Sequence, residues 1–139
     1  MKHFFLDTNV LLDFILRRDD FGPVARQLFE AASDRRVTLY ISVLSFSHIY
    51  YVLRKTNSAA ERLQALTELA AATNIIALDR PVVEATIALG FADFEDGLQY
   101  CAARTVPAIE AIVTRDPKGF AAGAQLVLTP PEALARLAA

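Results

Sequence analysis

The sequence contains a single cysteine, carries little net charge and lacks a long uninterrupted run of apolar residues. The one cysteine, Cys101, cannot form a disulfide within the chain, and the amino terminus has neither the apolar run nor the small-residue cleavage site of a secretory signal. Asp7, Asp13 and Arg17 interrupt the most apolar stretch, which leaves it short of the ~20 residues that cross a bilayer. These absences predict a soluble, cytoplasmic protein.

Charge and length limit the class of protein further. A net charge of −2 argues against a protein that coats nucleic acid through a strong, uniform positive field, but it allows a local basic patch. The 139 residues, 54% of them hydrophobic, are enough for one domain with a substantial core. Because no repeat, low-complexity stretch or linker divides the chain, residues 1–139 are predicted to form a single domain.

Strand-like and helix-like periods alternate along the sequence. Short apolar or β-branched segments predict strands at residues 2–6, 37–41, 75–78, 109–114 and 126–128. Helical spacing is expected over residues 10–16, 23–33, 43–55, 59–72, 81–91 and 93–104, and a last helix starts at Pro130. This alternation predicts an α/β fold, a three-layer α/β/α sandwich with a mostly parallel sheet of five strands.

Acidic residues follow two of the expected strands. Asp7 comes directly after the first strand, and Asp116 comes after the fourth. The carboxyl ends of parallel strands share one edge, where the ligands of open α/β sheets gather. Asp93 and Asp96 open an expected helix at spacing i, i+3, which places both on one helix face. We therefore expect these four carboxylates to converge on one cleft.

Carboxylates gathered so closely predict a bound cation. They repel one another unless some are protonated or a positive ion lies among them. Magnesium and manganese prefer carboxylate and water oxygens, and two such metals ~3.5–4 Å apart activate a water and stabilise the leaving oxygen in phosphodiester cleavage. The pattern therefore indicates a site for Mg²⁺ or Mn²⁺.

Each of these acids also has a purely structural interpretation. Asp93 fits a helix N-cap, and Asp96 fits the third position after it. Asp116 precedes Pro117 and fits the start of a turn, whereas Asp7 is able to cap the helix that follows it.

Two further acids are not expected in the cleft. Asp13 lies among the apolar residues of the first helix, where we expect it to be solvated or locally paired. Glu95 is adjacent to Asp96 and is expected to point elsewhere, because neighbouring helical residues do not share a face.

Three sequence segments occur in a fixed order: DTNVLLD at residues 7–13, DFEDGLQ at 93–99 and IVTRDPKGF at 112–120. Together they resemble the PIN-domain family, with the greatest likeness to the VapC-type toxins of bacterial toxin–antitoxin pairs. The likeness covers nearly the whole chain. It implies a Rossmann-like parallel sheet, metal-dependent cleavage of single-stranded RNA, dimerisation and neutralisation by a small antitoxin.

The resemblance assigns roles by position. Asp7, Asp96 and Asp116 match the acids that hold Mg²⁺ or Mn²⁺, which makes them the expected catalytic residues. Asn9 and Thr114 match polar residues that orient those acids through hydrogen bonds.

Two more positions belong to the metal site that the resemblance implies. Asp93 matches a position that is often acidic in this branch, whereas His48 stands where the family normally has a glutamate. Imidazole is a poorer ligand than carboxylate for Mg²⁺ and a better one for manganese or zinc. Three interpretations of His48 stay open: a helix residue hydrogen-bonded to Asp7 or to water, a metal ligand, and a participant in proton transfer.

Basic and aromatic residues are candidates for contact with RNA. Arg115 and Lys118 flank Asp116 and are the first choices for phosphate contacts, although both also fit ordinary solvated charge. Tyr50 and Tyr51 fit stacking on unpaired bases, or packing in a core or dimer face. A wider basic rim includes Arg17, Arg18, Arg54, Lys55 and Arg104.

Three classes of function remain. The favoured one is a metal-dependent endoribonuclease, the toxin of a toxin–antitoxin pair, with single-stranded RNA, a cognate antitoxin and a second copy of the chain as partners. The second is a PIN-like module that binds RNA or an antitoxin but cleaves weakly or not at all because of His48. The third is an aspartyl-phosphate enzyme or receiver domain with Asp7 as nucleophile, which fits poorly because such phosphatases need a second aspartate where this chain has Asn9.

Overall fold

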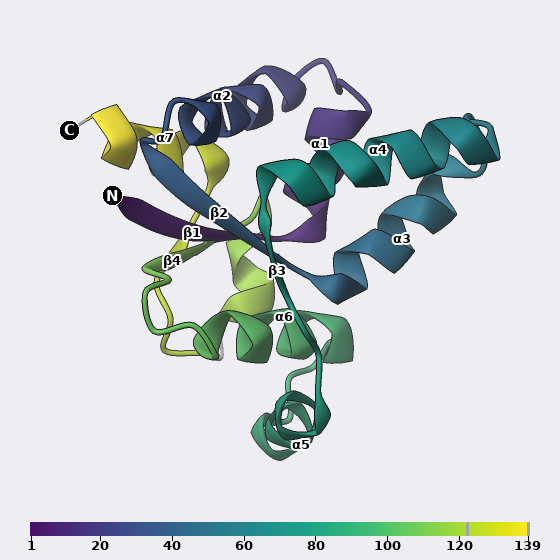
Figure 1. Ribbon diagram of the computed structural model, residues 1–139. Coiled ribbons are helices and arrows are strands. Elements are labelled where there is room, and N and C mark those ends of the chain that lie inside the picture. Colours follow the sequence, from purple (N-terminus) through teal and green to yellow (C-terminus); the bar gives the residue numbers. More distant parts are fainter. Residues whose placement is uncertain (122, 139) are drawn as a thin grey trace.

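The computed structural model describes residues 1–121 and 123–138 and shows helices on both sides of a parallel sheet (Figure 1). The strands are β1 Lys2–Leu6, β2 Val37–Ser42, β3 Asn74–Ile76, β4 Ala111–Val113 and β5 Val127–Leu128. The helices are α1 Thr8–Ile15, α2 Gly22–Ser33, α3 Val43–Leu53, α4 Ala59–Ala72, α5 Arg80–Leu89, α6 Phe94–Arg104 and α7 Pro130–Ala138, with a 3₁₀ helix, η1, at Pro117–Phe120. The sheet has five strands in the order β3-β2-β1-β4-β5, and every pair is parallel. The predicted α/β fold is confirmed.

The sheet is buried on both faces because its strands alternate between two apolar clusters. Phe4 and Leu6 belong to the larger cluster, which also holds side chains of α1, α2, α3, α4 and α7. Phe5 points to the opposite face and belongs to the second cluster, with side chains of α5, α6 and η1. Successive strand residues point to opposite faces, so a continuous apolar run such as residues 4–6 serves both clusters.

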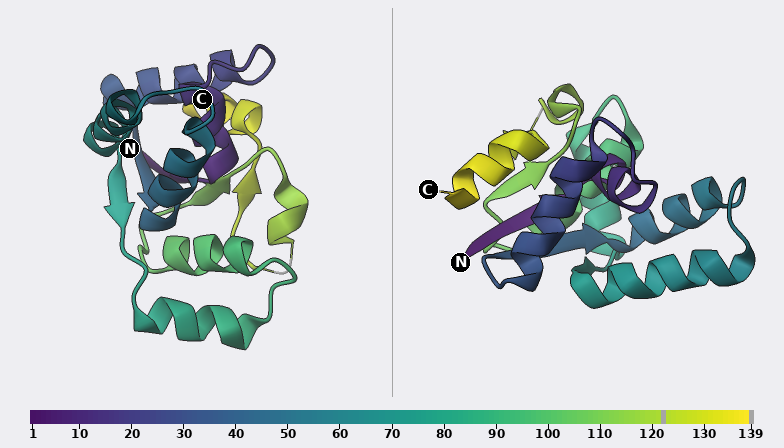
Figure 2. Two further views of the ribbon diagram at one scale, coloured as in Figure 1. Left: turned by 90° about the vertical axis from the view of Figure 1, so that its right-hand side faces the viewer. Right: turned by 90° about the horizontal axis from the view of Figure 1, so that it is seen from above.

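Helix α5 lies outside this sandwich, on the far side of α6 from the sheet (Figure 2). Gly97 of α6 allows the close contact between these two helices, because a Cβ there would lie 2.8 Å from the Cγ2 atom of Thr86 in α5. Gly90 ends α5 in the left-handed conformation, with φ of 66°, which a glycine adopts without strain. No helix in the described part of the chain is long and apolar enough to cross a membrane.

Three strands are shorter than the sequence predicts. β5 was expected over residues 126–128 and covers only Val127–Leu128, whereas for β3 and β4 the pairing with a neighbouring strand explains the difference. β3 was expected over residues 75–78, but it ends at Ile76, which pairs with Ser42, the last residue of β2. β4 was expected over residues 109–114, but it is a strand only from Ala111 to Val113, the part that pairs with β1.

Candidate active site

The carboxyl ends of β1 and β4 lie side by side, which brings Asp7 close to the segment that carries Asp116. Leu6 pairs with Val113, and the backbone N–H of Asp7 donates to the Val113 carbonyl at 3.0 Å. η1 begins directly after Asp116, so this acid lies between a strand end and a short helix. The pairing of the two strands therefore sets the separation of the two acids.

Hydrogen bonds hold the Asp7 carboxylate from both sides. Thr114 Oγ1 donates to its Oδ2 at 2.8 Å, and Asn9 Nδ2 donates to the same oxygen at 3.3 Å. Its Oδ1 accepts the backbone N–H of Thr8 at 2.8 Å, which also makes Asp7 the N-cap of α1. Thr114 Oγ1 accepts the backbone N–H of Asp116 at 3.1 Å. One threonine hydroxyl thus links the two acids.

Burial raises the pKa of Asp7 above its ordinary value, although the hydrogen bonds from Thr114 and Thr8 act in the opposite direction. The negative charges of Glu95 and Asp116 raise this pKa further. Both residues therefore lie within electrostatic range of Asp7.

Asp96, in the first turn of α6, belongs to the same cluster of charges. Burial raises its pKa, and four neighbouring carboxylates raise it further, to about 6. In decreasing order of effect they are Asp93, Asp7, Glu95 and Asp116. The charges of Asp93, Asp7 and Asp116, which the sequence singled out, thus act on Asp96, as does the charge of Glu95.

The position of Asp96 depends on neighbours on both sides. Asp93 is the N-cap of α6, and its Oδ1 accepts the backbone N–H of Asp96 at 3.0 Å, so the structural interpretation of Asp93 applies. On the other side, a Cβ on Gly119 would lie 2.6 Å from Asp96 Oδ2. Only a glycine at position 119 leaves the carboxylate in place.

These donors fit a hard divalent cation by their chemistry. Among residues 1–121 and 123–138, no three histidine, cysteine or acidic side chains are already gathered into a metal-binding group. The carboxylates nevertheless raise one another's pKa, and no ion pair in this part of the chain joins Asp7, Asp96 or Asp116 to a lysine or arginine. Mg²⁺ or Mn²⁺ would relieve that repulsion through ligands of the type they prefer.

His48 contacts Glu95 and not Asp7. The ring Nδ1 lies 3.1 Å from Glu95 Oε1, and an ionised carboxylate only accepts hydrogen bonds, so Nδ1–H is the donor. Glu95, which was expected to point away from Asp96, thus reaches across to α3, and its charge still contributes to raising the pKa of Asp7 and Asp96. The rule for neighbouring helical residues describes where Cβ atoms lie, whereas a glutamate side chain is long enough to reach across to α3.

A buried polar network beside Asp7 was missed by the sequence analysis. Gln99 Nε2 donates to Thr8 Oγ1 at 3.0 Å and to Ser45 Oγ at 3.3 Å, while Ser42 Oγ donates to Gln99 Oε1 at 2.5 Å. All four side chains are buried. The available signal was a glutamine directly before residues 100–103, which carry no charge and include Cys101, Ala102 and Ala103.

The two predicted RNA-binding residues have different surroundings. Arg115 forms a paired contact with Asp13, with Nε at 2.6 Å and Nη2 at 3.2 Å from its oxygens, and lies 4.2 Å from the centre of the Phe21 ring. Arg18 Nη1 also bonds to Asp13 at 3.0 Å, so Asp13 is buried and locally paired, one of the two expected alternatives. Lys118 is exposed, and no ion pair within the described residues engages it.

The two tyrosines that were predicted to stack on bases each lie against an arginine. The guanidinium of Arg54, one of the predicted basic residues, lies 4.0 Å from the centre of the Tyr51 ring, and that of Arg62, which was not among them, lies 4.6 Å from the centre of the Tyr50 ring. Tyr51 is 60% exposed, which leaves it accessible for stacking.

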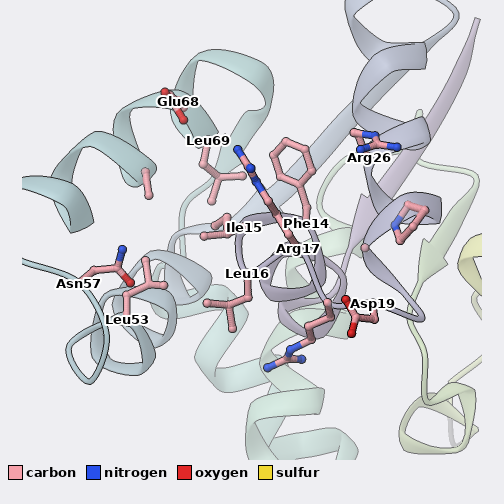
Figure 3. A pocket seen from close by; sticks show the side chains of 14 residues that line it. Phe14, Ile15, Leu16, Arg17, Asp19, Arg26, Leu53, Asn57, Glu68 and Leu69 are labelled. Carbon is pink, nitrogen blue, oxygen red and sulfur yellow. The ribbon is translucent and has the colours of Figure 1, made fainter.

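A groove of about 750 Å³ lies between α1, α2, α3 and α4 (Figure 3). Its apolar lining includes Phe14, Ile15, Leu16, Leu53, Ala65 and Leu69. Its charged lining consists of Arg17, Arg18, Asp19, Arg26 and Glu68. Two of these arginines also pair with acids, Arg18 with Asp13 and Arg26 with Glu30.

The sequence matches a family model described as PIN domain over residues 3–118. No curated protein matches the chain. The solved structures give similar folds at low sequence identity, as follows.

A toxin–antitoxin complex from Klebsiella pneumoniae has a TM-score of 0.67 and 24% identity, covering 91% of this chain and 96% of that one. VapBC2 from Rickettsia felis, bound to a DNA fragment from its promoter, also has a TM-score of 0.67, with 19% identity and coverage of 91% and 96%. VapC20 from Mycobacterium tuberculosis, a toxin that cleaves the sarcin–ricin loop, has a TM-score of 0.68 and 15% identity, with coverage of 86% and 95%. These likenesses show a shared fold.

Proposed function

Because the chain belongs to the PIN-domain family, we propose that it is an endoribonuclease that cleaves single-stranded RNA with Mg²⁺ or Mn²⁺, as the toxin of a toxin–antitoxin pair. One observation carries the proposal. Asp7, Asp96 and Asp116 come from distant parts of the sequence, yet their charges act on one another at one edge of the sheet. Clustered acids without a basic partner are costly to keep for structure alone, which supports a catalytic role.

In this mechanism Asp7, Asp96 and Asp116 would hold the cation, and Asp93 adds negative charge beside Asp96. When bound, the cation would supply Lewis-acid activation of a water and stabilisation of the leaving oxygen of the phosphodiester. Thr114 and Asn9 keep the Asp7 carboxylate oriented through the hydrogen bonds described above.

For the substrate, Lys118 is the side chain free to meet an RNA phosphate. Arg115 is the second proposed contact, but its bonds to Asp13 also fasten the segment that leads into Asp116. We therefore propose that Arg115 chiefly positions this segment.

Two partners complete the proposal. The Klebsiella and Rickettsia neighbours are toxin–antitoxin assemblies, and the groove between α1 and α4 combines apolar walls with three arginines. An antitoxin segment with apolar and acidic residues fits this groove. A second copy of the chain is the other proposed partner, with exposed Val83 and Ile87, one turn apart on α5, offering apolar surface.

The proposed activity is tested by incubating the purified protein with a panel of labelled single-stranded RNAs. We expect products with Mg²⁺ or Mn²⁺, none with chelator, and none from Asp7→Asn prepared in parallel. Equal products from both proteins would reveal a contaminating nuclease. RNA or antitoxin binding without products at any metal concentration would instead favour the alternative, a PIN-fold binding protein weakened by His48.

Gly119→Ala is expected to slow RNA cleavage about 10- to 100-fold while the protein stays folded, because the added methyl group displaces Asp96. Gly90→Ala is the matched control. It places a side chain at a φ of 66° in open space on α5, so it lowers stability by about 1 kcal/mol but leaves the cleavage rate unchanged. Initial rates and thermal unfolding of both variants check this, and wild-type cleavage by Gly119→Ala would contradict it.

A further inference from the structure

Helices α3 and α6 face each other through two layers of polar side chains beside Asp7. The inner layer is the buried network in which Gln99 of α6 donates to Ser45 of α3 and to Thr8, the residue after Asp7. Because both hydrogen bonds are buried, they fix the relative positions of the two helices and of the carboxyl end of β1.

The outer layer is formed by His48 and Glu95. His48 follows Ser45 by three residues on α3, and Glu95 precedes Gln99 by four on α6, so each shares a helix face with its inner-layer neighbour. The side chains of His48 and Glu95 are 40% and 48% exposed, and their Nδ1–Oε1 distance is 3.1 Å. This pair thus lies on the solvent side of the network, one turn out from it.

Glu95 also acts on the acids of the candidate site. Its charge is among the causes that raise the pKa of both Asp7 and Asp96. Its carboxylate is therefore in electrostatic range of both acids while a ring N–H of His48 restrains it.

We propose that Glu95 is a further cation-binding residue of this site and that His48 is the positioning residue that holds Glu95 toward Asp7 and Asp96. This inference rests on the proposed function, because it takes the bound species to be Mg²⁺ or Mn²⁺. It assigns His48 a role through the N–H of its Nδ1 atom, and it removes the need for the imidazole itself to bind a metal. It also extends the site to a carboxylate whose position the sequence analysis did not foresee.

Binding of Mn²⁺ to the metal-free protein, followed by the electron paramagnetic resonance signal of free Mn²⁺, tests the role of Glu95. Glu95→Gln keeps the shape of the side chain and is expected to weaken Mn²⁺ affinity about 10- to 100-fold. Glu84→Gln is the matched control, because it removes one carboxylate from exposed surface on α5, where Glu84 pairs with Arg80. The control is expected to bind Mn²⁺ as the wild type does.

Three variants at position 48 test the positioning role. His48→Ala is expected to weaken Mn²⁺ binding about 10-fold, and His48→Asn to restore most of the affinity, since its amide N–H can donate near the position of Nδ1. In the Glu95→Gln background, His48→Ala is expected to have no further effect, because His48 acts through Glu95. His48→Glu is expected to weaken binding, since the new carboxylate repels Glu95.

The possible results separate this inference from the function on which it rests. If Glu95→Gln binds Mn²⁺ as tightly as Glu84→Gln while Asp96→Asn does not bind it, the role of Glu95 is overturned and the proposed nuclease site stands. Additive losses from His48→Ala and Glu95→Gln would overturn the positioning role of His48. Absence of Mn²⁺ binding to the wild type would overturn both proposals.

Discussion

Replacing Asp13 with alanine is expected to lower the free energy of unfolding by about 3 kcal/mol. The Asp13 side chain is 1% exposed and accepts three hydrogen bonds from the guanidinium groups of Arg115 and Arg18. Removing one partner of a buried ion pair costs ~3–5 kcal/mol, and the lower end applies because both arginines are partly exposed and regain water. Urea unfolding followed by circular dichroism measures the change.

Asp19→Ala is the matched control for this prediction, because Asp19 is an exposed acid in the loop after α1. It is expected to change stability by less than about 0.5 kcal/mol. Asp13→Ala also frees Arg115, which directly precedes Asp116, so the fraction that remains folded is expected to cleave RNA more slowly than Asp19→Ala. Equal unfolding midpoints for the two variants would show that the Asp13 ion pairs do not stabilise the fold.

The order and type of the main elements follow from sequence periodicity, but their limits and neighbours depend on tertiary contacts. The apolar run at residues 4–6 predicts a buried strand, and the structure places it at the centre of the sheet. β3 lies at the edge of the sheet and stops at Ile76 because its neighbour, β2, stops at Ser42, which no local pattern reveals. The position of α5 outside α6 depends on Gly97, whose missing side chain matters only once the two helices meet.

The candidate active site likewise has features that could be predicted from the sequence and features that could not. The proximity of Asp7 to the Asp116 segment follows from a rule about parallel strands, so it could be predicted from the sequence. The bonds between Arg115 and Asp13 join residues 102 positions apart, and Asp13 gave only the local signal of an acid among apolar neighbours. The contact between Glu95 and His48 was not predicted, because helix geometry fixes where a side chain starts but not how far a long one reaches.

Asp96→Asn is expected to reduce metal-dependent RNA cleavage about 10³-fold, because loss of a metal-binding carboxylate removes several kcal/mol of transition-state stabilisation. The same variant is expected to be more stable than the wild type at neutral pH when a chelator is present. Burial and neighbouring charges raise the pKa of Asp96 from 3.8 to about 6 in the folded protein, so its ionised form is unfavourable there. Asparagine has the same shape without the charge.

The pH dependence follows from the sign of that shift. The folded protein binds a proton at Asp96 more tightly than the unfolded chain does, so wild-type stability falls as the pH rises from about 4 through about 6. Asp96 is partly exposed and its charge is screened, so the expected gain for Asp96→Asn is about 1 kcal/mol at pH 7.5 and vanishes near pH 4. Chemical unfolding with chelator across this range measures the difference.

Added Mn²⁺ is expected to reverse the order of stability, because only the wild type binds it well and binding stabilises the folded state by RT ln(1 + [L]/Kd). If Asp96→Asn were less stable than the wild type at neutral pH without metal, Asp96 would be an acid that the fold needs.

The expected opposite effects of Asp96→Asn on stability and on RNA cleavage have one physical cause. A carboxylate that burial and like charges destabilise in the free protein is well suited to a cation, so Asp96 weakens the fold for the same reason that it serves the site.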